Sequence, residues 1–455
     1  MIIKELSKFI VNLDYDKIPK TTIEKAKLCL LDFLGVANRG FLEESVQIAL
    51  KSIDELFGFN DNLKNQKSSI IGNGHSNILI AGFINGISAH ALDLDDGHRF
   101  AQLHPGATVF SSALAVAEAN NVDGKKFLES VICGYEVAIV LGKLVNPYHR
   151  NQGFHTSGTI GTFSAGAVTS KLLNLDLKRT INALGLCGTQ SSGLLESDHM
   201  GTMGKQLHLG KSVSNGILSA YLAKNGFTGA ESIMDGNEGF LKAMSFFLLE
   251  DIGINNTKNY LNDYLNKSIG KFHINEVYLK KYPFCRHLHS SIDSIVNIKD
   301  NNDLNIDDID EISIITYKIA SNHNNFNPKN KEDIKQSLPY AVAFHFFDEN
   351  EINRDKFNLN EPKLEKILKL IKIEESEEFN KLTPNFRPSK IIIKTFKGNY
   401  ENSVMLPKGE AENPFSKEDI LKKFESLNPN FNLDNLKNID YLEFLNIVDF
   451  MKKIN

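Results

Sequence analysis

The chain has 455 residues, of which 42% are hydrophobic and 24% are charged, and this composition is typical of a globular protein with a sizeable core. A net charge of -5 argues against nucleic acid or an anionic membrane surface as a partner. Four scattered cysteines without CxxC spacing favour a reduced compartment over a disulfide scaffold or a zinc ribbon. No secretory signal and no run of about 18 apolar residues is apparent, so we expect a cytoplasmic protein.

Residues 1 to about 265 show the pattern of successive helices. The segment "TTIEKAKLCLLDFLGVANRG" predicts a helix that begins at a Thr-Thr cap and ends at Gly40. Four later segments, among them "GTIGTFSAGAVTSKLLNLD" and "GKSVSNGILSAYLAKNGFTG", combine Ala, Gly and Ser with apolar residues, which favours closely packed core helices. The glycine spacing of the first of these has no GK[ST] and no preceding strand, so it favours helix packing over phosphate binding.

The pattern changes near residue 270. "HINEVYLKKYPF" predicts an extended segment, "HSSIDSIVNIKDN" and "DIKQSLPYAVAFHFF" predict helices, and "IDEISIITYKIA" alternates like a strand. "PSKIIIKTFKGNYENSVML" predicts a hairpin that turns at Lys-Gly-Asn, and the tail after it returns to helix. The fold class is therefore mainly α, with a large all-helical domain over residues 1–268 that the tail 406–455 completes. A smaller α/β (α+β) domain spans residues 269–405.

Titratable residues gather in four short segments. "ALDLDDGHRFAQLHPGATV" and "QGFHTSG" contribute histidines and aspartates, while "GTMGKQLHLGKSV" and "KKYPFCRHLHSSID" add lysines and further histidines. If these segments converge, they form a pocket rich in imidazole and cationic groups at a domain interface. Lysine and arginine would bind the carboxylates of a substrate, and a histidine would transfer a proton. The candidate residues are Asp93, Asp95, Asp96, His98, Arg99, His104, His155, Lys205, His208, Lys211, Lys280, Lys281, Cys285, Arg286, His287 and His289.

Each segment also has a simpler interpretation. His104 precedes Pro105 and Gly106 and could be a turn residue that caps a helix, while the three aspartates could cap helices and solvate a loop. The aspartates with His98 and His104 could bind a metal, but no HExxH or EF-hand spacing supports this. Lys205 and His208 could lie on a plain helix surface, and Cys285 could be a buried structural thiol rather than a nucleophile.

Taken together, the motifs resemble those of the MmgE/PrpD family. The resemblance rests on "HALDLDDGH" with "HPGATV", "GFHTSGTIGTFSAGAV", "GTMGKQLHLGKSVSNG", "NGFTGAESIMDGNEGF", "KKYPFCRHLHSSID" and "SLPYAVAF", in this order over roughly residues 20 to 400. It implies a helical domain with a smaller α/β lid domain, a homodimer, and cofactor-independent chemistry on a di- or tricarboxylate. Family members include 2-methylcitrate dehydratases, cis-aconitate decarboxylases and iminodisuccinate epimerases.

The resemblance also implies roles for individual residues. Asp93, His104, His155 and Lys205 would be catalytic, and the substrate would be bound by His98, His208, Lys280, Cys285, Arg286 and His289. Two departures matter. Gly97 stands where the family often has threonine, so a hydroxyl contact to substrate is missing. Cys285 stands where cis-aconitate decarboxylases carry a histidine, which counts against decarboxylation.

These observations predict a lyase that removes water from a tricarboxylate such as 2-methylcitrate without a cofactor or metal. Four cysteines in unrelated contexts could not easily hold an iron–sulfur cluster. His104 or His155 would abstract the carbon-bound proton while the other protonates the leaving hydroxyl. An epimerase, a cis-aconitate-type decarboxylase and a non-catalytic carboxylate-binding protein are the alternatives.

Overall fold

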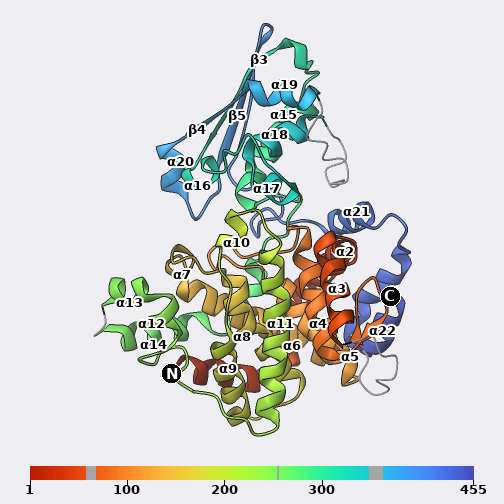
Figure 1. The fold of residues 1–455 in the computed structure, drawn as a ribbon, viewed down its shortest axis with the longest axis vertical. Coiled ribbons are helices and arrows are strands. Elements are labelled where there is room, and N and C mark those ends of the chain that lie inside the picture. The colour runs from red at the N-terminus through yellow and green to blue at the C-terminus, as the bar shows by residue number, and fades with distance from the viewer. Residues whose placement is uncertain (58–67, 254–255, 348–361) are drawn as a thin grey trace. The chain divides into compact units, whose positions relative to one another are not determined.

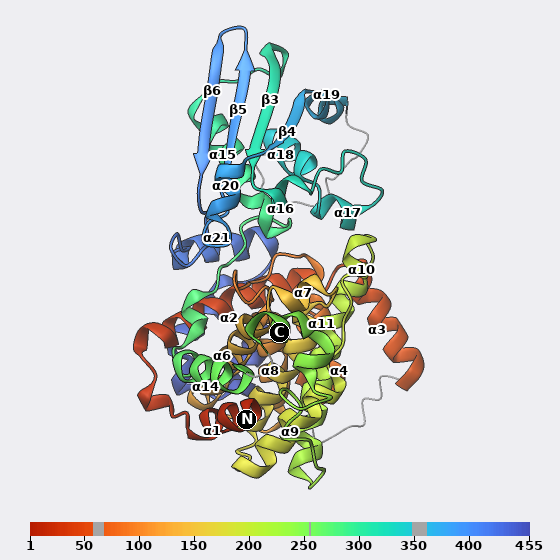
Figure 2. The ribbon, with the colours of Figure 1, turned by 90° about the vertical axis from the view of Figure 1, so that its left-hand side faces the viewer.

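The structure is a computed structural model that describes residues 1–57, 68–253, 256–347 and 362–455. The chain divides into two compact units, one formed by residues 1–278 with 417–455 and the other by residues 279–416 (Figure 1, Figure 2). The C-terminal tail therefore lies in the same unit as the N-terminal helices. No helix within the described ranges is long and apolar enough to cross a membrane.

The first unit is built almost entirely of helices. Its α-helices are α1 (Ile2–Asn12), α2 (Lys20–Gly40), α3 (Glu44–Phe57), α4 (Ile78–Ala91), α5 (Pro105–Ala119), α6 (Gly124–Val145), α7 (Tyr148–Asn151), α8 (Thr156–Leu172), α9 (Leu177–Gln190), α10 (Glu196–His199), α11 (Gly204–Lys224), α12 (Phe240–Met244), α13 (Phe246–Ile252), α14 (Thr257–Ser268), α21 (Lys417–Leu427) and α22 (Ile447–Ile454). Shorter elements are the 3-10 helices η1 (Tyr15–Lys17), η3 (His273–Glu276) and η7 (Leu433–Phe444) and the antiparallel strands β1 (Ser68–Ser69) and β2 (His75–Ser76).

Helix α8 forms the centre of this unit, and all of its residues are buried. It packs against α5, α6, α9 and α11. A Cβ atom added to Gly216 of α11 would lie 2.6 Å from the backbone nitrogen of Gly166 in α8, so only glycine permits this approach. The sequence-based prediction that the small residues allow core helices to pack closely is therefore confirmed. The polar residues at the N-terminal ends of α8 and α11 are consequently held on rigid supports.

Local sequence explains where several of these helices begin. Asp123 and Asp176 each accept a hydrogen bond from the backbone N–H three residues later and so cap α6 and α9. Pro105 occupies the first turn of α5, where its missing N–H costs nothing. Helix α2 begins at Lys20, slightly before the expected cap at Thr21 and Thr22, and no side chain caps it.

A buried ion pair ties the C-terminal helix α21 to the rest of the first unit. Lys423 of α21 lies 2.6 Å from the Asp32 carboxylate of α2, and its ammonium group also donates to the Leu94 carbonyl at 3.1 Å. Burial raises the pKa of Asp32, while the adjacent Lys423 opposes this shift. Because Leu94 belongs to the loop that follows α4, the tail helps to fix that loop.

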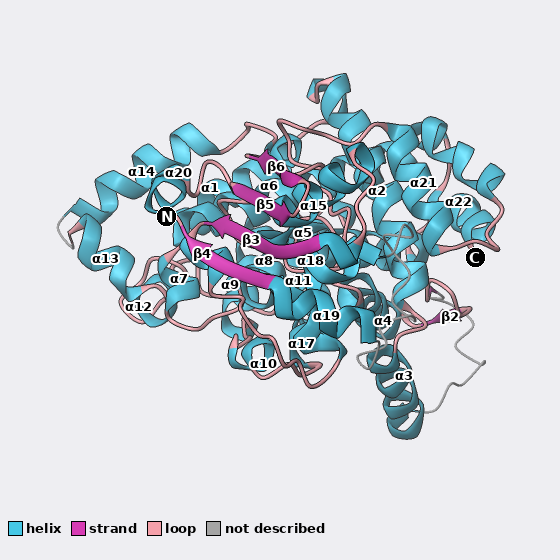
Figure 3. Ribbon diagram, turned by 90° about the horizontal axis from the view of Figure 1, so that it is seen from above, coloured by secondary structure: helices cyan, strands magenta, loops and turns pink. Residues whose placement is uncertain are grey.

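The second unit combines a four-stranded sheet with helices, and Figure 3 shows these strands in magenta. The strand order is β4-β3-β5-β6, with β3 parallel to β4 and antiparallel to β5, and with β5 antiparallel to β6. The strands are β3 (Ile309–Thr316), β4 (Ile371–Glu375), β5 (Ser389–Thr395) and β6 (Gly398–Val404). The helices are η4 (Arg286–Leu288), α15 (His289–Asn301), η5 (Ile306–Asp308), α16 (Lys318–Ser321), α17 (Lys331–Lys335), α18 (Leu338–Phe347), α19 (Pro362–Leu370) and α20 (Glu377–Leu382).

The core of the second unit lies between the sheet and its helices. Ile312 and Ile314 of β3 and Ile391 and Ile393 of β5 are fully buried, and they form one cluster with apolar residues of α15 and α18. The alternation of these isoleucines is the pattern expected for a sheet with one covered face. The fold class predicted from the sequence, mainly α with a smaller α/β part, is confirmed.

Two segments differ from the sequence-based expectation. Residues 273–276 form a 3-10 helix rather than an extended segment, because the Glu136 carboxylate accepts the N–H groups of Gly270, Lys271 and His273. The expected single helix of "DIKQSLPYAVAFHFF" is divided into α17 and α18, since the Ser337 hydroxyl accepts the N–H of Tyr340 at a new helix start. The hairpin is confirmed, although its strands end at 395 and resume at 398.

Candidate active site

The loop of residues 92–104, between α4 and α5, carries most of the predicted acidic residues and is held firmly. The Asp96 carboxylate accepts the N–H of Gly106 at 2.8 Å and the hydroxyl of Tyr135 at 2.5 Å. Burial raises the pKa of Asp96 to about 7, although both hydrogen bonds favour its carboxylate. Asp93 has a left-handed backbone with φ of +51°, which aspartate tolerates better than most residues. Asp96 therefore positions the loop, as the simpler interpretation of the aspartates proposed.

His104 ends this loop and presents one ring nitrogen as a base. It occupies the N-cap position of α5, but its side chain makes no capping hydrogen bond. Its Nδ1 lies 2.7 Å from the Asp96 carbonyl, and its backbone N–H donates to the Ser157 hydroxyl at 3.0 Å. Because a carbonyl can only accept, Nδ1 carries the hydrogen and Nε2 keeps its lone pair in the neutral ring.

His155 and His208 form a pair in which the rings share a hydrogen bond. His155 is the N-cap residue of α8, and its Nδ1 lies 3.0 Å from the Nδ1 of His208 in α11. Burial, reinforced by the positive charge of Lys205, holds the pKa of His155 well below its usual value. Burial also lowers the pKa of His208. Both rings are therefore neutral near pH 7, and one of them donates to the other.

Lys205 supplies the positive charge of the site from the first turn of α11. Its ammonium nitrogen lies 3.2 Å from the Asp198 carboxylate and 3.8 Å from that of Asp93. Burial acts to raise the pKa of Asp198, but Lys205 outweighs burial and holds that pKa below its usual range. Lys205 and His208 are three residues apart and so lie on one face of α11. The structure thus brings Asp93, Lys205, His155 and His208 together, as the sequence predicted.

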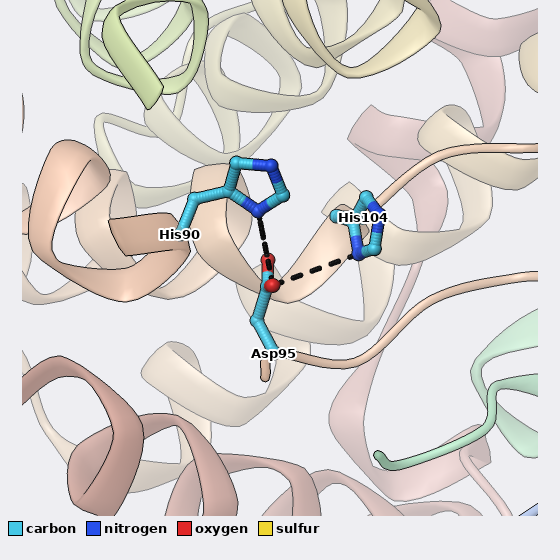
Figure 4. A group of neighbouring side chains, drawn as sticks. All are labelled: His90, Asp95 and His104. Carbon is cyan, nitrogen blue, oxygen red and sulfur yellow. Dashed lines mark hydrogen bonds and ion pairs between the residues drawn. The ribbon is translucent and has the colours of Figure 1, made fainter. Parts of the chain in front are cut away.

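Sequence reasoning missed His90 and assigned no catalytic role to Asp95. His90 lies in the last turn of α4, and its Nδ1 lies 2.9 Å and 3.0 Å from the two oxygens of Asp95 (Figure 4). The His90 ring centroid is 4.8 Å from that of His104 and 6.1 Å from that of His155. The signal available in the sequence was a single histidine in an otherwise apolar helix one turn before "DLDD".

The same three residues are the group of potential metal ligands found within the described ranges. The ligand atoms of His90, Asp95 and His104 lie within 4.8 Å of one another. The His90 and Asp95 atoms already form a hydrogen bond, and the Nδ1 of His104 donates to the Asp96 carbonyl. A metal ion at this place would replace these bonds, so we assign hydrogen bonding to the group. That the activity needs no metal or cofactor stays a prediction.

His98 is engaged by the protein through both ring nitrogens. Its Nδ1 accepts the N–H of Ala101 at 3.0 Å, and its Nε2 lies 3.0 Å from the carboxylate of Glu276. Its side chain is 1% exposed. A substrate group would have to displace one of these partners to reach His98. The arrangement therefore gives His98 a structural role, and its predicted contact with substrate stays a prediction.

Tyr278 occupies the space beside Gly97. The two residues form a backbone bridge, with hydrogen bonds of 3.0 Å and 2.9 Å between their N–H and carbonyl groups. A Cβ atom at Gly97 would lie 2.4 Å from the Tyr278 hydroxyl oxygen. The side chain that the family often has at this position could not be accommodated unless Tyr278 moved. Gly97 is therefore required by the position of the tyrosine ring.

The remaining predicted substrate ligands belong to the second unit. Lys280 is buried there, and Arg286 is bonded to Glu410, with its Nε and Nη2 each 3.1 Å from the Glu410 Oε1. Arg286 also donates to the Nδ1 of His289 at 3.0 Å, and the Nε2 of His289 donates to the Phe284 carbonyl. The prediction that these residues complete a pocket with those of the first unit stays a prediction.

Cys285 has an imidazole partner that the sequence did not reveal. Its sulfur lies 3.7 Å from the Nε2 of His323, whose Nδ1 donates to the Gln336 carbonyl at 2.9 Å. The Nε2 of His323 therefore accepts from the thiol when the ring is neutral. Cys285 is partly exposed rather than buried, unlike Cys29, Cys133 and Cys187.

Comparison with known proteins places the chain in a family. The model of the MmgE/PrpD N-terminal domain matches residues 4–246, and that of the MmgE/PrpD C-terminal domain matches residues 282–435. A cis-aconitate decarboxylase of Aspergillus terreus is 24% identical over 449 residues, which cover 94% of this chain and 89% of that protein. The cis-aconitate decarboxylase-like protein oryM of Aspergillus oryzae is 26% identical over 328 residues, covering 70% and 66%. The Homo sapiens cis-aconitate decarboxylase is 27% identical over 225 residues, covering 48% and 45%. The chain thus belongs to the MmgE/PrpD family.

Proposed function

We propose that the chain is a cofactor-independent lyase that transfers a proton at a carbon atom of a small polycarboxylate. The observation that carries this proposal is the cluster of imidazoles beside one lysine ammonium group in the first unit. His104 offers a basic Nε2, the His155–His208 pair offers a second donor or acceptor, and Lys205 offers a positive charge. Such a set suits a substrate whose carboxylates need a cation and whose reacting carbon gains or loses a proton.

We further propose decarboxylation of cis-aconitate as the first activity to test. This reaction differs from the dehydration expected from the sequence. Support comes from the relatives named above, three of which carry cis-aconitate decarboxylase in their names. In this reaction the carbon–carbon bond to one carboxylate breaks and carbon dioxide leaves with no electrons from that bond. The electron pair stays on the substrate as an extended carbanion, and a proton that the Nε2 of His104 has first taken up from solvent completes the product. Lys205 would stabilise the remaining carboxylate as the charge develops.

Dehydration of a 2-hydroxy tricarboxylate such as 2-methylcitrate is the second candidate, and Cys285 favours it. The cis-aconitate decarboxylases that the sequence motifs resemble carry histidine at this position. In this chain the position holds the Cys285 thiol, which has His323 as its partner. Dehydration uses the same proton transfer in the opposite direction, with a base removing the carbon-bound proton and an acid protonating the hydroxyl that leaves. Epimerisation would need the same base and a second group that returns the proton on the other face.

The experiment is a proton-NMR assay of purified protein in deuterated water, with cis-aconitate, 2-methylcitrate, citrate and iminodisuccinate offered separately. Carbon dioxide release with a new alkene signal from cis-aconitate supports decarboxylation, and a vinylic signal from 2-methylcitrate supports dehydration. Loss of an α-proton signal without alkene formation identifies an epimerase. Tight binding with every compound recovered unchanged and no deuterium incorporated would contradict the proposal and favour a carboxylate-binding protein. The Lys205→Ala variant serves as the negative control.

A further inference from the structure

We propose that His90 is a positioning residue which orients the Asp95 carboxylate, and that Asp95 in turn stabilises the proton on His104 during the reaction. This inference rests on the proposed function, in which His104 transfers a proton. His90 and Asp95 are 1% and 2% exposed, so their hydrogen bonds of 2.9 Å and 3.0 Å are shielded from water. A buried carboxylate that accepts from an imidazole is held in a defined orientation.

The surroundings of the second ring nitrogen of His90, Nε2, indicate which nitrogen carries the proton. In Figure 4 the Nε2 of His90 points away from Asp95, and within the described part of the chain it has no hydrogen-bond partner. A proton on Nε2 would therefore be buried without an acceptor, which is costly. His90 consequently acts as a neutral donor through Nδ1. It orients the carboxylate without adding a positive charge beside it.

Asp95 is placed to act on His104. The Asp95 Oδ1 lies 3.7 Å from the His104 Nδ1, and that Nδ1 donates its hydrogen to the Asp96 carbonyl at 2.7 Å. Asp95 therefore acts through its charge, which favours the protonated ring of His104. Because the site is buried, this attraction is stronger than it would be in water. The carboxylate therefore favours the protonated form of His104, whether its Nε2 takes a proton from the substrate or delivers one to it.

Other charged and titratable groups surround this cluster from each neighbouring element. Lys205 is a cation of this site, and it is itself paired with Asp93 and Asp198. His155 and His208 both have lowered pKa values, so neither adds a full positive charge near pH 7. The described groups recorded around this cluster include His90 from α4, Asp93, Asp95 and Asp96 from the loop, Tyr135 from α6, His155 from the start of α8, Asp198 from α10, Lys205 and His208 from α11, and the more distant pair Asp32 and Lys423.

Two matched variants of His90 test the role directly. In His90→Asn an amide donor remains close to the position of Nδ1, whereas His90→Leu removes the donor at similar volume. We expect kcat of the Asn variant to stay within about threefold of the parent, and that of the Leu variant to fall by roughly 10- to 100-fold, the range typical of residues that orient a functional group. KM should change little in both, since neither side chain contacts substrate.

The Asp95→Asn variant tests the second half of the proposal through the pH profile. Without the negative charge, protonation of His104 is less favourable, so the limb of kcat/KM that reports His104 should move to lower pH by about one unit. This is the alkaline limb if His104 delivers a proton, as in decarboxylation, and the acidic limb if His104 removes one, as in dehydration. A loss of structure alone would lower the plateau and leave the limb where it is. Circular dichroism and the thermal midpoint identify any variant that fails to fold.

Nitrogen-15 NMR of histidine-labelled protein provides a test that does not depend on activity. We expect several buried rings to be protonated only on Nδ1 over the working pH range, and the signals of one of them, which is His90, to be absent from His90→Asn. Equal damage in His90→Asn and His90→Leu would overturn the proposal, because His90 would then transfer a proton itself. It would also be overturned if the limb that reports His104 did not move in Asp95→Asn. The proposal would be overturned as well if the active protein held one zinc ion per chain, required that ion for activity, and lost it in Asp95→Asn.

A final control separates this inference from the proposed function. If His104→Asn keeps full activity, His104 is not the proton-transfer group and the proposed function fails at that point. If His104→Asn is inactive while Asp95→Asn and His90→Leu match the parent in rate and pH profile, the proposed function stands and only the positioning role is rejected.

Discussion

The two units each contain a buried cluster of histidines with a cation, and the clusters differ in how their hydrogen bonds are used. In the second unit Arg286 donates to Glu410, His289 and two backbone carbonyls, and His289 uses both of its nitrogens. In the first unit the imidazoles pair with each other, as His155 does with His208. The Nε2 of His90 has no partner within the described residues.

This difference separates groups that hold the fold from groups that can do chemistry. Where each donor already has an acceptor in the protein, as in Arg286 and His289, a substrate would have to displace a partner in order to bind. A cluster of imidazoles whose nitrogens can still take up or release a proton is costly to bury, and such clusters are found where function requires them. Both clusters look alike in the sequence, where each is a short run of histidine with lysine or arginine.

The largest expected effect concerns the bonded cluster of the second unit. Arg286→Met leaves the buried Glu410 carboxylate without its main partner, so the free energy of unfolding should fall by about 3–5 kcal/mol. Urea denaturation followed by fluorescence measures this loss. Arg179→Met, which breaks an exposed pair with Asp176, is the control and should cost less than about 1 kcal/mol. Equal losses in the two variants would remove the distinction between the clusters.

The matching change in the first unit should alter activity more than stability. Lys205→Ala should lower kcat/KM by roughly 100- to 1,000-fold, the effect of removing one charged group that stabilises a developing negative charge. The thermal midpoint should fall less than in Arg286→Met, because Lys205 and Asp198 are both partly exposed to water. Lys211→Ala on the same helix is exposed and serves as the control. Unchanged turnover in a folded Lys205→Ala protein would contradict the assignment of the site.

Acid should weaken the first unit because its buried histidines resist protonation. Burial lowers the pKa of His149 from its ordinary 6.5 to about 4, so below pH 6.5 the unfolded chain binds a proton that the folded chain does not. Stability is therefore lost as pH falls from about 6.5 to about 4, by up to about 3 kcal/mol for this residue. Unfolding curves at several pH values should show a flatter dependence in His149→Asn. The same slope in the variant would show that other groups cause the acid sensitivity.

The smallest expected effect concerns Gly97. In Gly97→Ala the new methyl group meets the Tyr278 ring, so we expect a loss of about 1–3 kcal/mol in the free energy of unfolding. The double variant Gly97→Ala with Tyr278→Leu should show a coupling between the two positions, since the shorter side chain relieves the contact. If the two losses simply add, the new methyl group does not press against Tyr278, and the clash is relieved in another way.

Local patterns predicted much of this fold. The helix that ends at Gly40, the helix 289–301, the strand 309–316 and the hairpin of β5 and β6 follow from caps, periodicity and turn residues. Residues 273–276 were not predictable, because their 3-10 helix depends on Glu136, more than 130 positions away. Long-range hydrogen bonds of this kind leave no mark in a local window of sequence.

The candidate site was predictable as a set of residue types, but its internal partnerships were not. Asp93, His104, His155 and Lys205 stand out because histidine is rare and the motifs gather it. His90 was overlooked because a single histidine in an apolar helix is usually a core residue. Its importance follows from the Asp95 carboxylate, which only the turn after α4 brings within 2.9 Å.

The most direct test of the account is whether His104 delivers or removes the proton at carbon. The measurement is the incorporation of deuterium from deuterated water into product or recovered substrate, by the parent protein and by His104→Asn, with the compound that the NMR assay identifies as substrate. We expect one carbon-bound deuterium per turnover in the product of decarboxylation or epimerisation, or exchange of deuterium into recovered substrate if the reaction is dehydration, and a loss of this incorporation by roughly 100-fold or more in the variant. Undiminished incorporation by a folded His104→Asn protein would contradict the account.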